Sequence, residues 1–147
     1  MIGITYEMKR RKKNKTVISF VVALILITSI QQGCSYQMSF DKTMMEAASE
    51  FNKSCPIMVD GVTRLDNAIA LPDNIFQYNY TLINMGKNSV NIDELTSYLE
   101  PIIVNNVKTN PGLKSYRENR VTMVYYYKDK NGNYLTEIEV SPDKYGN

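Results

Sequence analysis

Residues 121–140 read VTMVYYYKDKNGNYLTEIEV, and no other stretch of the chain says as much about the fold. Apolar and polar residues alternate on both sides of Asn131-Gly132, a dipeptide that favours a two-residue type I′ turn between antiparallel strands. The expected pairs on one face are Tyr127 with Thr136, Tyr125 with Ile138, and Met123 with Val140. The other face carries Thr122, Tyr126, Lys128, Glu137 and Glu139. The stretch therefore predicts a hairpin with one buried and one solvated side.

A similar pattern lies upstream, where residues 62–71 and 76–85 flank the turn-forming sequence PDNI at 72–75. The expected pairs on the buried face are Leu71 with Phe76, Ile69 with Tyr78, Asn67 with Tyr80, and Leu65 with Leu82. The expected solvated face carries Arg64, Asp66, Ala68, Ala70, Gln77, Asn79 and Thr81.

Helical spacing precedes each hairpin. Residues 41–52 repeat apolar side chains every three or four positions, at Met44, Met45, Ala48 and Phe51. A second helix is expected after Asn91, which is a good N-cap with Glu94 three residues later. Its expected apolar face consists of Ile92, Leu95, Leu99, Ile102 and Ile103. We expect Pro101 to kink or end this helix, and Asn110-Pro111 to start a short one that reaches about residue 118.

The order helix, hairpin, helix, hairpin predicts an α+β fold, with a four-stranded antiparallel sheet and its helices on one face. Residues 41–147 would form this single domain, because about 105 residues is an ordinary domain size.

The N-terminal segment, residues 1–33, has the composition of an export signal or membrane helix. It carries six basic residues against the single acid Glu7, and the basic cluster 9–15 is followed by the apolar stretch 16–30. As a helix this stretch spans about 22 Å, against roughly 30 Å of bilayer hydrocarbon. Basic residues in front of it keep that end in the cytoplasm, so residues after about 34 are expected outside, at the bacterial cell envelope.

The residues that follow, QQGCS at 31–35, are similar to a bacterial lipoprotein cleavage site, with Cys34 as the candidate lipidation site. Gln31 departs from that pattern, where an apolar residue is expected. Three alternatives stay open: a lipoprotein, an uncleaved signal anchor and a secreted protein. Residues 34–40 are polar and are expected to form a tether.

The second cysteine, Cys55, has two readings. In an exported protein it could pair with Cys34 if that residue carries no lipid. Otherwise it is a small buried side chain in front of Pro56.

Composition excludes several functions. Residues 34–147 carry 11 basic and 14 acidic residues, so the domain lacks the basic surface of a nucleic-acid binder. The chain has no histidine, which removes the usual general base and the commonest zinc ligand. Asp129, Asn131 and Asn133 are spaced like the start of a calcium loop, but Val140 stands where its glutamate belongs. We therefore expect a turn there, and no metal, cofactor or catalytic residue.

Two groups of side chains are candidates for binding. Asp60, Arg64 and Asp66 place two carboxylates near an arginine, which could act as acid and base or form an ordinary surface ion pair. Tyr126 is expected on the polar face beside Lys128 and Glu137, as in a binding surface or a cross-strand packing pair. The candidate binding residues are Tyr126, Lys128, Glu137, Arg64 and Asp66.

The runs FNKSCPIMVD at 51–60, TRLD at 63–66 and YNYTL at 78–82 resemble a group of small exported proteins of Gram-negative bacteria. The similarity extends to the tyrosines at 125–127 and to Asn131-Gly132. The resemblance implies an envelope protein of unassigned function and gives no catalytic residue. It also implies a cysteine near the C-terminus, which this chain lacks.

Together these features predict a non-enzymatic binding module that is anchored to the membrane by its N-terminal segment or by lipid. Its partner would be another envelope protein or a small ligand. Two alternatives are an enzyme that acts on an envelope component through Asp60, Arg64 and Asp66, and a structural subunit of an envelope complex. The sequence leaves the oligomeric state open.

Overall fold

The computed structural model describes the backbone of residues 32–146 and the side chains from Phe40 onward. The predicted export segment, including the apolar stretch 16–30, lies outside the described residues. The chain divides into two compact units, Met1–Met38 and Ser39–Asn147, and the second contains the whole sheet. No helix in the described part of the chain is both long and apolar enough to cross a membrane.

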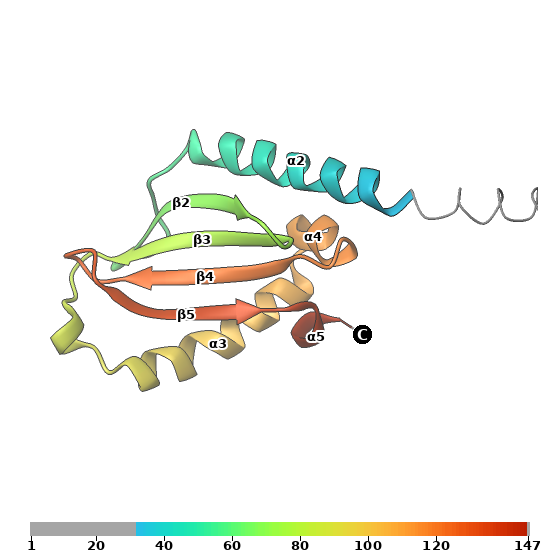
Figure 1. Ribbon diagram of the computed structural model, residues 1–147. Coiled ribbons are helices and arrows are strands. Elements are labelled where there is room, and N and C mark those ends of the chain that lie inside the picture. Colours follow the sequence, from blue (N-terminus) through green and yellow to red (C-terminus); the bar gives the residue numbers. More distant parts are fainter. Residues whose placement is uncertain (1–31, 147) are drawn as a thin grey trace, which may run out of the picture. The chain divides into compact units, whose positions relative to one another are not determined.

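Five strands form one mixed sheet in the order β1-β2-β3-β4-β5 (Figure 1). The strands are β1 Ile57–Met58, β2 Thr63–Leu71, β3 Ile75–Leu82, β4 Thr122–Lys128 and β5 Tyr134–Val140. Neighbouring strands are antiparallel except β3 and β4, which are parallel. The α+β class is confirmed, but the prediction of a four-stranded antiparallel sheet is wrong.

The parallel pair arises from the connection between β3 and β4. This connection contains α3 (Ile92–Thr109), which runs back along the sheet and returns the chain to the end where β3 begins (Figure 1). A helical crossover of this kind is how parallel neighbours are joined. Two hairpins read separately from the sequence contain no information about this pairing. The strand that the sequence does not predict, β1, has only two residues, which is too few for an alternating pattern.

The β4–β5 hairpin has the predicted register, with the three expected pairs opposite each other. Its turn is different. The connection runs from Asp129 to Asn133, and Gly132 has a φ of +84° while Asn131 keeps a negative φ. A type I′ turn needs positive φ at both central residues. The turn is instead built around the Asp129 carboxylate, which accepts hydrogen bonds from the N–H groups of Asn131 and Asn133 at 2.8 Å each.

The predicted register of the β2–β3 hairpin is wrong. Leu71 pairs with Ile75, because Asp73 and Asn74 both have a φ near +60° and make a tighter turn than expected. A β-bulge between Leu65 and Asn67 then shifts the pairing again. As a result, Ala68 is fully buried, whereas Ile69 lies on the other face and is 37% exposed.

The helical segments agree with the expectations in part, since a short helical stretch follows Asn110 up to Glu118 as predicted, whereas α2 and α3 are longer than expected. The helix α2 spans Gln32–Asn52, so it includes residues 34–40, for which a tether was expected. The helix α3 begins after Asn91, whose side chain accepts the N–H of Glu94 as predicted. It continues through Pro101, although an internal proline costs about 3 kcal/mol. The remaining segments are η2 (Lys87–Ser89), η3 (Pro111–Leu113), α4 (Lys114–Glu118) and α5 (Pro142–Tyr145).

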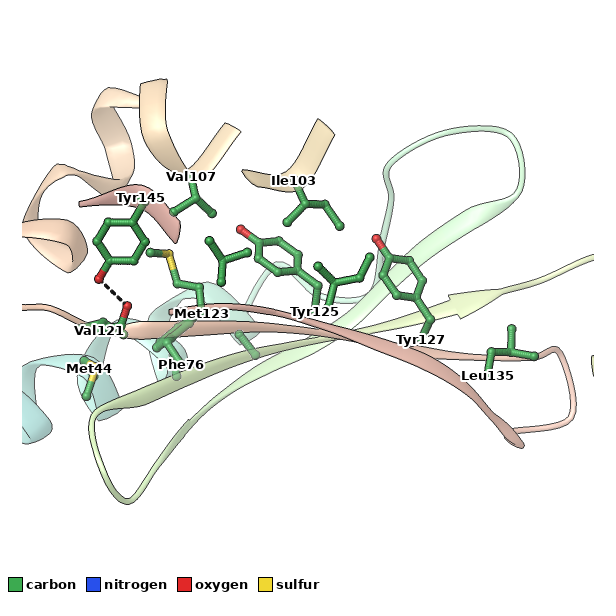
Figure 2. Close-up of a cluster of buried hydrophobic side chains, with 14 of the residues drawn as sticks. Met44, Phe76, Ile103, Val107, Val121, Met123, Tyr125, Tyr127, Leu135 and Tyr145 are labelled. Atoms are coloured by element: carbon green, nitrogen blue, oxygen red, sulfur yellow. Dashed lines mark hydrogen bonds between the residues drawn. The ribbon is translucent and has the colours of Figure 1, made fainter. Parts of the chain in front are cut away.

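The core lies between one face of the sheet, called here the inner face, and the helices. Met44 and Ala48 of α2 belong to the same buried cluster as Ile103 and Val107 of α3, so both helices cover this face. Figure 2 shows side chains of β4 rising toward α3. Tyr145 of α5 closes the cluster, where its hydroxyl donates a 2.6 Å hydrogen bond to the carbonyl of Val121 (Figure 2).

The edge of β2 is closed by a side chain of α2. The Asn52 amide accepts the N–H of Ala68 and donates to its carbonyl, both at 2.7 Å. These are the backbone groups that a neighbouring strand would otherwise bind. A single residue thus blunts an exposed sheet edge.

Candidate functional site

The binding residues predicted from the sequence lie on the side of the sheet opposite the helices, called here the outer face. Arg64 pairs with Thr81, and Thr81 with Lys128, across three neighbouring strands. The next row runs Asn67, Asn79, Tyr126 and Glu137 across β2 to β5. The structure therefore brings all five candidates onto one surface.

Asp66 is the centre of an ion cluster on this face. Its carboxylate accepts hydrogen bonds from Arg64 Nε and Thr81 Oγ1 at 2.6 Å each, and Lys128 Nζ lies 3.4 Å away. Burial opposes the charge of Asp66, but the hydrogen bonds from Thr81 and Arg64 outweigh it and hold the pKa below its usual value. The β-bulge in β2 supplies this geometry, because it adds Asp66 to the strand without a partner of its own.

A ladder of side-chain amides lies beside the ion cluster. Gln77 donates to Asn79, and Asn79 donates to Asn67, at 2.7 Å each. On the other side of the row, the rings of Tyr126 and Tyr134 are 5.2 Å apart. The outer face thus combines charge, amides and aromatic surface.

Asp60 is separated from Arg64 and Asp66. It lies in the loop before β2 and contributes to the lining of a groove on the inner face. Its Oδ1 accepts the N–H groups of Val62 and Thr63 at 2.7 Å each, and the hydrogen bond from Val62 is the main reason why the pKa of Asp60 is lowered. The acid–base constellation that the sequence allowed is not assembled.

The groove on the inner face has a volume of about 790 Å³. The β1–β2 loop forms one wall and α3 the other, while strands β3 and β4 form the floor. Its apolar lining residues include Val59, Val62, Met85, Tyr98, Leu99 and Ile102. A smaller hollow of about 360 Å³ shares Met85, Leu95 and Tyr98 with it, so the furrow continues along α3 toward Asn91.

Exposed apolar side chains are concentrated at this groove. Nine large hydrophobic residues in the described part of the chain are exposed, and five of them line it. These five are Val59, Val62, Met85, Tyr98 and Ile102. Tyr98 is 67% exposed and Ile102 is 51% exposed, which is unusual for one helix face. Clustered exposed apolar surface marks an interaction site more often than scattered residues do.

The floor of the groove is a row of stacked tyrosines. Tyr80 stacks on Tyr127 with ring centroids 5.0 Å apart, and on Tyr125 at 6.3 Å. Burial raises the pKa of Tyr127 to about 12 and that of Tyr80 and Tyr125 further, so all three phenols are neutral. The floor is a rigid, uncharged aromatic surface.

The rim at Met85 is fixed by the β4–β5 turn. Asp129 is fully buried and accepts the N–H of Lys87 at 2.9 Å, while the N–H of Lys130 donates to the carbonyl of Met85 at 3.0 Å. The pKa of Asp129 lies well below its usual range, mainly because the Asn133 side chain donates a hydrogen bond to the carboxylate. Burial acts in the opposite direction and is outweighed. Asp129 thus has a structural role, and no group of three or more metal-ligating side chains occurs among the side chains described from Phe40 onward.

Sequence reasoning missed the groove because its walls come from segments that are distant in the chain. One signal was present. The sequence predicts Ile102 on the buried face of its helix, and this is wrong, since Ile102 is half-exposed and lines the groove with Tyr98. The apolar stripe of α3 is wider than packing against the sheet requires. This excess width is the sequence feature that indicates a second contact.

The structure describes the side chain of only one of the two cysteines. Cys55 is half-buried and forms no disulfide with any side chain described from Phe40 onward, and burial together with the nearby Asp66 carboxylate raises its pKa. The side chain of Cys34 lies outside those that the structure describes. Lipidation of Cys34 and its pairing with Cys55 stay predictions.

Three solved structures share this fold. A Pseudomonas aeruginosa protein named as a candidate secreted protein has a TM-score of 0.61 at 10% identity, over 73% of this chain and 93% of its own. The pilotin EpsS of the Vibrio vulnificus type 2 secretion system has a TM-score of 0.59 at 11% identity, over 75% and 94%. The type II secretion system pilotin AspS of Vibrio cholerae has a TM-score of 0.58 at 13% identity, over 76% and 96%.

At such identities the likeness establishes a common fold. No curated protein sequence matches the chain significantly. A family model does match, over residues 39–136, which include α2 from Ser39 and all five strands up to Thr136 of β5. The chain belongs to the family described as a domain of unknown function, DUF8479.

Proposed function

We propose that this protein is a non-enzymatic binding module of the bacterial cell envelope, which holds an apolar segment of a partner protein in the inner-face groove. The observation that carries the proposal is the concentration of exposed apolar side chains there. The fold supports it, because secretion-system pilotins are built on the same architecture. The N-terminal segment supports an envelope location through its export pattern.

The shape of the furrow suggests what kind of segment it binds. It follows α3 from about Asn106 to Asn91, a distance of about 22 Å at 1.5 Å per helical residue. Among the described residues, the only charged ones that line it are Asp60 and Glu94, both acidic. An elongated apolar segment with basic residues near its ends therefore fits in both shape and charge.

Site-specific photocrosslinking in cells tests the proposal. A photoreactive amino acid at position 98 should give one dominant protein adduct, and an additional Ile102→Asp substitution should abolish it, because a charge in the groove opposes an apolar ligand. The same amino acid at position 45 is the control, since Met45 is 63% exposed but lies outside the groove.

Equal adducts from positions 98 and 45 would contradict a specific groove ligand. So would an adduct at position 98 that persists with Ile102→Asp. Ile102 is half-exposed, so its substitution should leave the thermal unfolding of the domain nearly unchanged.

A further inference from the structure

The outer face carries a second set of binding groups that has no part in the inner-face groove. Two cations, Arg64 and Lys128, share the single carboxylate of Asp66, so these three side chains carry one net positive charge, while Glu137 lies in the next row, with two strands between it and Asn67. The net positive charge lies on a domain whose residues 34–147 sum to an excess of three acids. A local positive site on an acidic domain favours a specific anion over general attraction to anionic surfaces.

The donors of this cluster are only partly used. Arg64 contacts Asp66 through Nε, and its two terminal nitrogens make no hydrogen bond within the described residues. Its side chain is 41% exposed and that of Lys128 is 30% exposed, so both remain reachable. The guanidinium fork matches a carboxylate in two parallel hydrogen bonds.

The groups around the cluster match hydroxyl-bearing ligands. The amide ladder runs in one direction from Gln77 through Asn79 to Asn67, so it ends at β2 with the amide N–H groups of Asn67 as unused donors beside the cations. Tyr126 follows Asn79 in the same row and offers the flank of an aromatic ring. Glu137, which is exposed, comes next and supplies an acceptor.

We propose that the outer face binds an acidic saccharide, with the sugar carboxylate on Arg64 and Lys128. The sugar hydroxyls would contact Asn67, Asn79 and Glu137, and the apolar side of the ring would lie on Tyr126. The row spans four strands, about 14 Å at strand spacing, which accommodates one or two sugar units.

Nuclear magnetic resonance titration of the full chain in a detergent without sugar groups tests this site. The probe is D-glucuronate, and its matched controls are the neutral D-glucuronamide and acetate at equal ionic strength. Glucuronate should shift the backbone amide signals of the outer face at Arg64, Asn67, Asn79 and Lys128. Glucuronamide and acetate should each bind roughly tenfold more weakly, because one lacks the charge and the other lacks the hydroxyls.

Two variants locate the binding. Arg64→Gln and Lys128→Gln should each weaken glucuronate binding roughly tenfold. Lys114→Gln, at an exposed lysine on α4, should leave it unchanged. Absence of shifts with glucuronate, equal binding of acetate, or equal loss with Lys114→Gln would each overturn the proposal. The titration of the unsubstituted chain decides the matter even if a variant fails to fold.

Discussion

The hydrogen bond between Tyr145 and Val121 gives a stability prediction that can be worked from the structure. The Tyr145 hydroxyl donates to the Val121 carbonyl at 2.6 Å, and the tyrosine is only 8% exposed. The substitution Tyr145→Phe keeps the ring and removes the donor. The carbonyl then stays buried without this partner, which costs about 1–2 kcal/mol in the free energy of unfolding.

The expected change is measurable by urea unfolding followed by circular dichroism. Thermal unfolding is a second readout, because 1 kcal/mol corresponds to about 4–8 °C in melting temperature for a domain of about 100 residues. Tyr145→Ala should cost about 3–5 kcal/mol, because it also removes the packed ring. The difference between the two variants separates the hydrogen bond from the burial of the ring.

The matched control is Tyr98→Phe, since Tyr98 is 67% exposed and no hydrogen bond from its hydroxyl is present in the described part of the chain. This change should alter stability by less than about 0.5 kcal/mol. If Tyr145→Phe is as stable as the unsubstituted chain, or if Tyr98→Phe costs as much, the reasoning about the buried hydrogen bond is refuted.

Three further substitutions test the turns and the sheet edge. Asp129→Asn should lower the melting temperature at pH 7, and the difference should shrink as the pH falls below 3.8, the ordinary pKa of the group, toward the lower folded-state pKa. Asn52→Ala should cost about 1–3 kcal/mol and promote association through β2, because Ala68 loses both partners. Asn74→Ala should destabilise more than Asn74→Gly by about 1 kcal/mol, since alanine is strained at a φ of +61°.

Each of these three has a result that would count against it. A constant effect of Asp129→Asn from pH 7 to pH 2 would mean that the charge of the carboxylate is unimportant. Asn52→Ala is compared with Asn84→Ala at an exposed position, and equal behaviour of the two in urea unfolding and light scattering would exclude the edge argument. Equal unfolding of the two Asn74 variants would show that the positive φ is not maintained.

The sequence predicts those parts of this fold that depend on neighbouring residues. The register of β4 and β5 follows from alternation on both sides of Asn131-Gly132, and Asn91 caps α3 through its own side chain. The register of β2 fails because the turn at Asp73 and Asn74 shifts the pairing of residues 67–71 by one, and a bulge at Asp66 shifts it again. Nothing local in the sequence indicates the bulge. The side chains at Ala68 and Ala70 then face the helices, although their small size gives no hydrophobic signal.

The two surfaces proposed for binding also differ in how far the sequence predicts them. Arg64 and Asp66 are two residues apart in one strand, so their pairing is visible in the sequence. The groove depends instead on the meeting of the β1–β2 loop with α3, which follows from the strand order and the crossover. Pairing of β3 with β4 is what brings Tyr80 beside Tyr127, and no local pattern contains that contact.

The anchoring of the groove rims has a thermodynamic consequence. The turn at Asp60 holds one rim through the N–H groups of Val62 and Thr63, and the hydrogen bond from Lys130 holds the other at Met85. Neither rim has to become ordered when a ligand arrives, and the stacked floor has few rotamers to lose. If the groove holds an apolar segment as proposed, association should lose less conformational entropy than it would on flexible loops, so a modest contact area should suffice for tight binding.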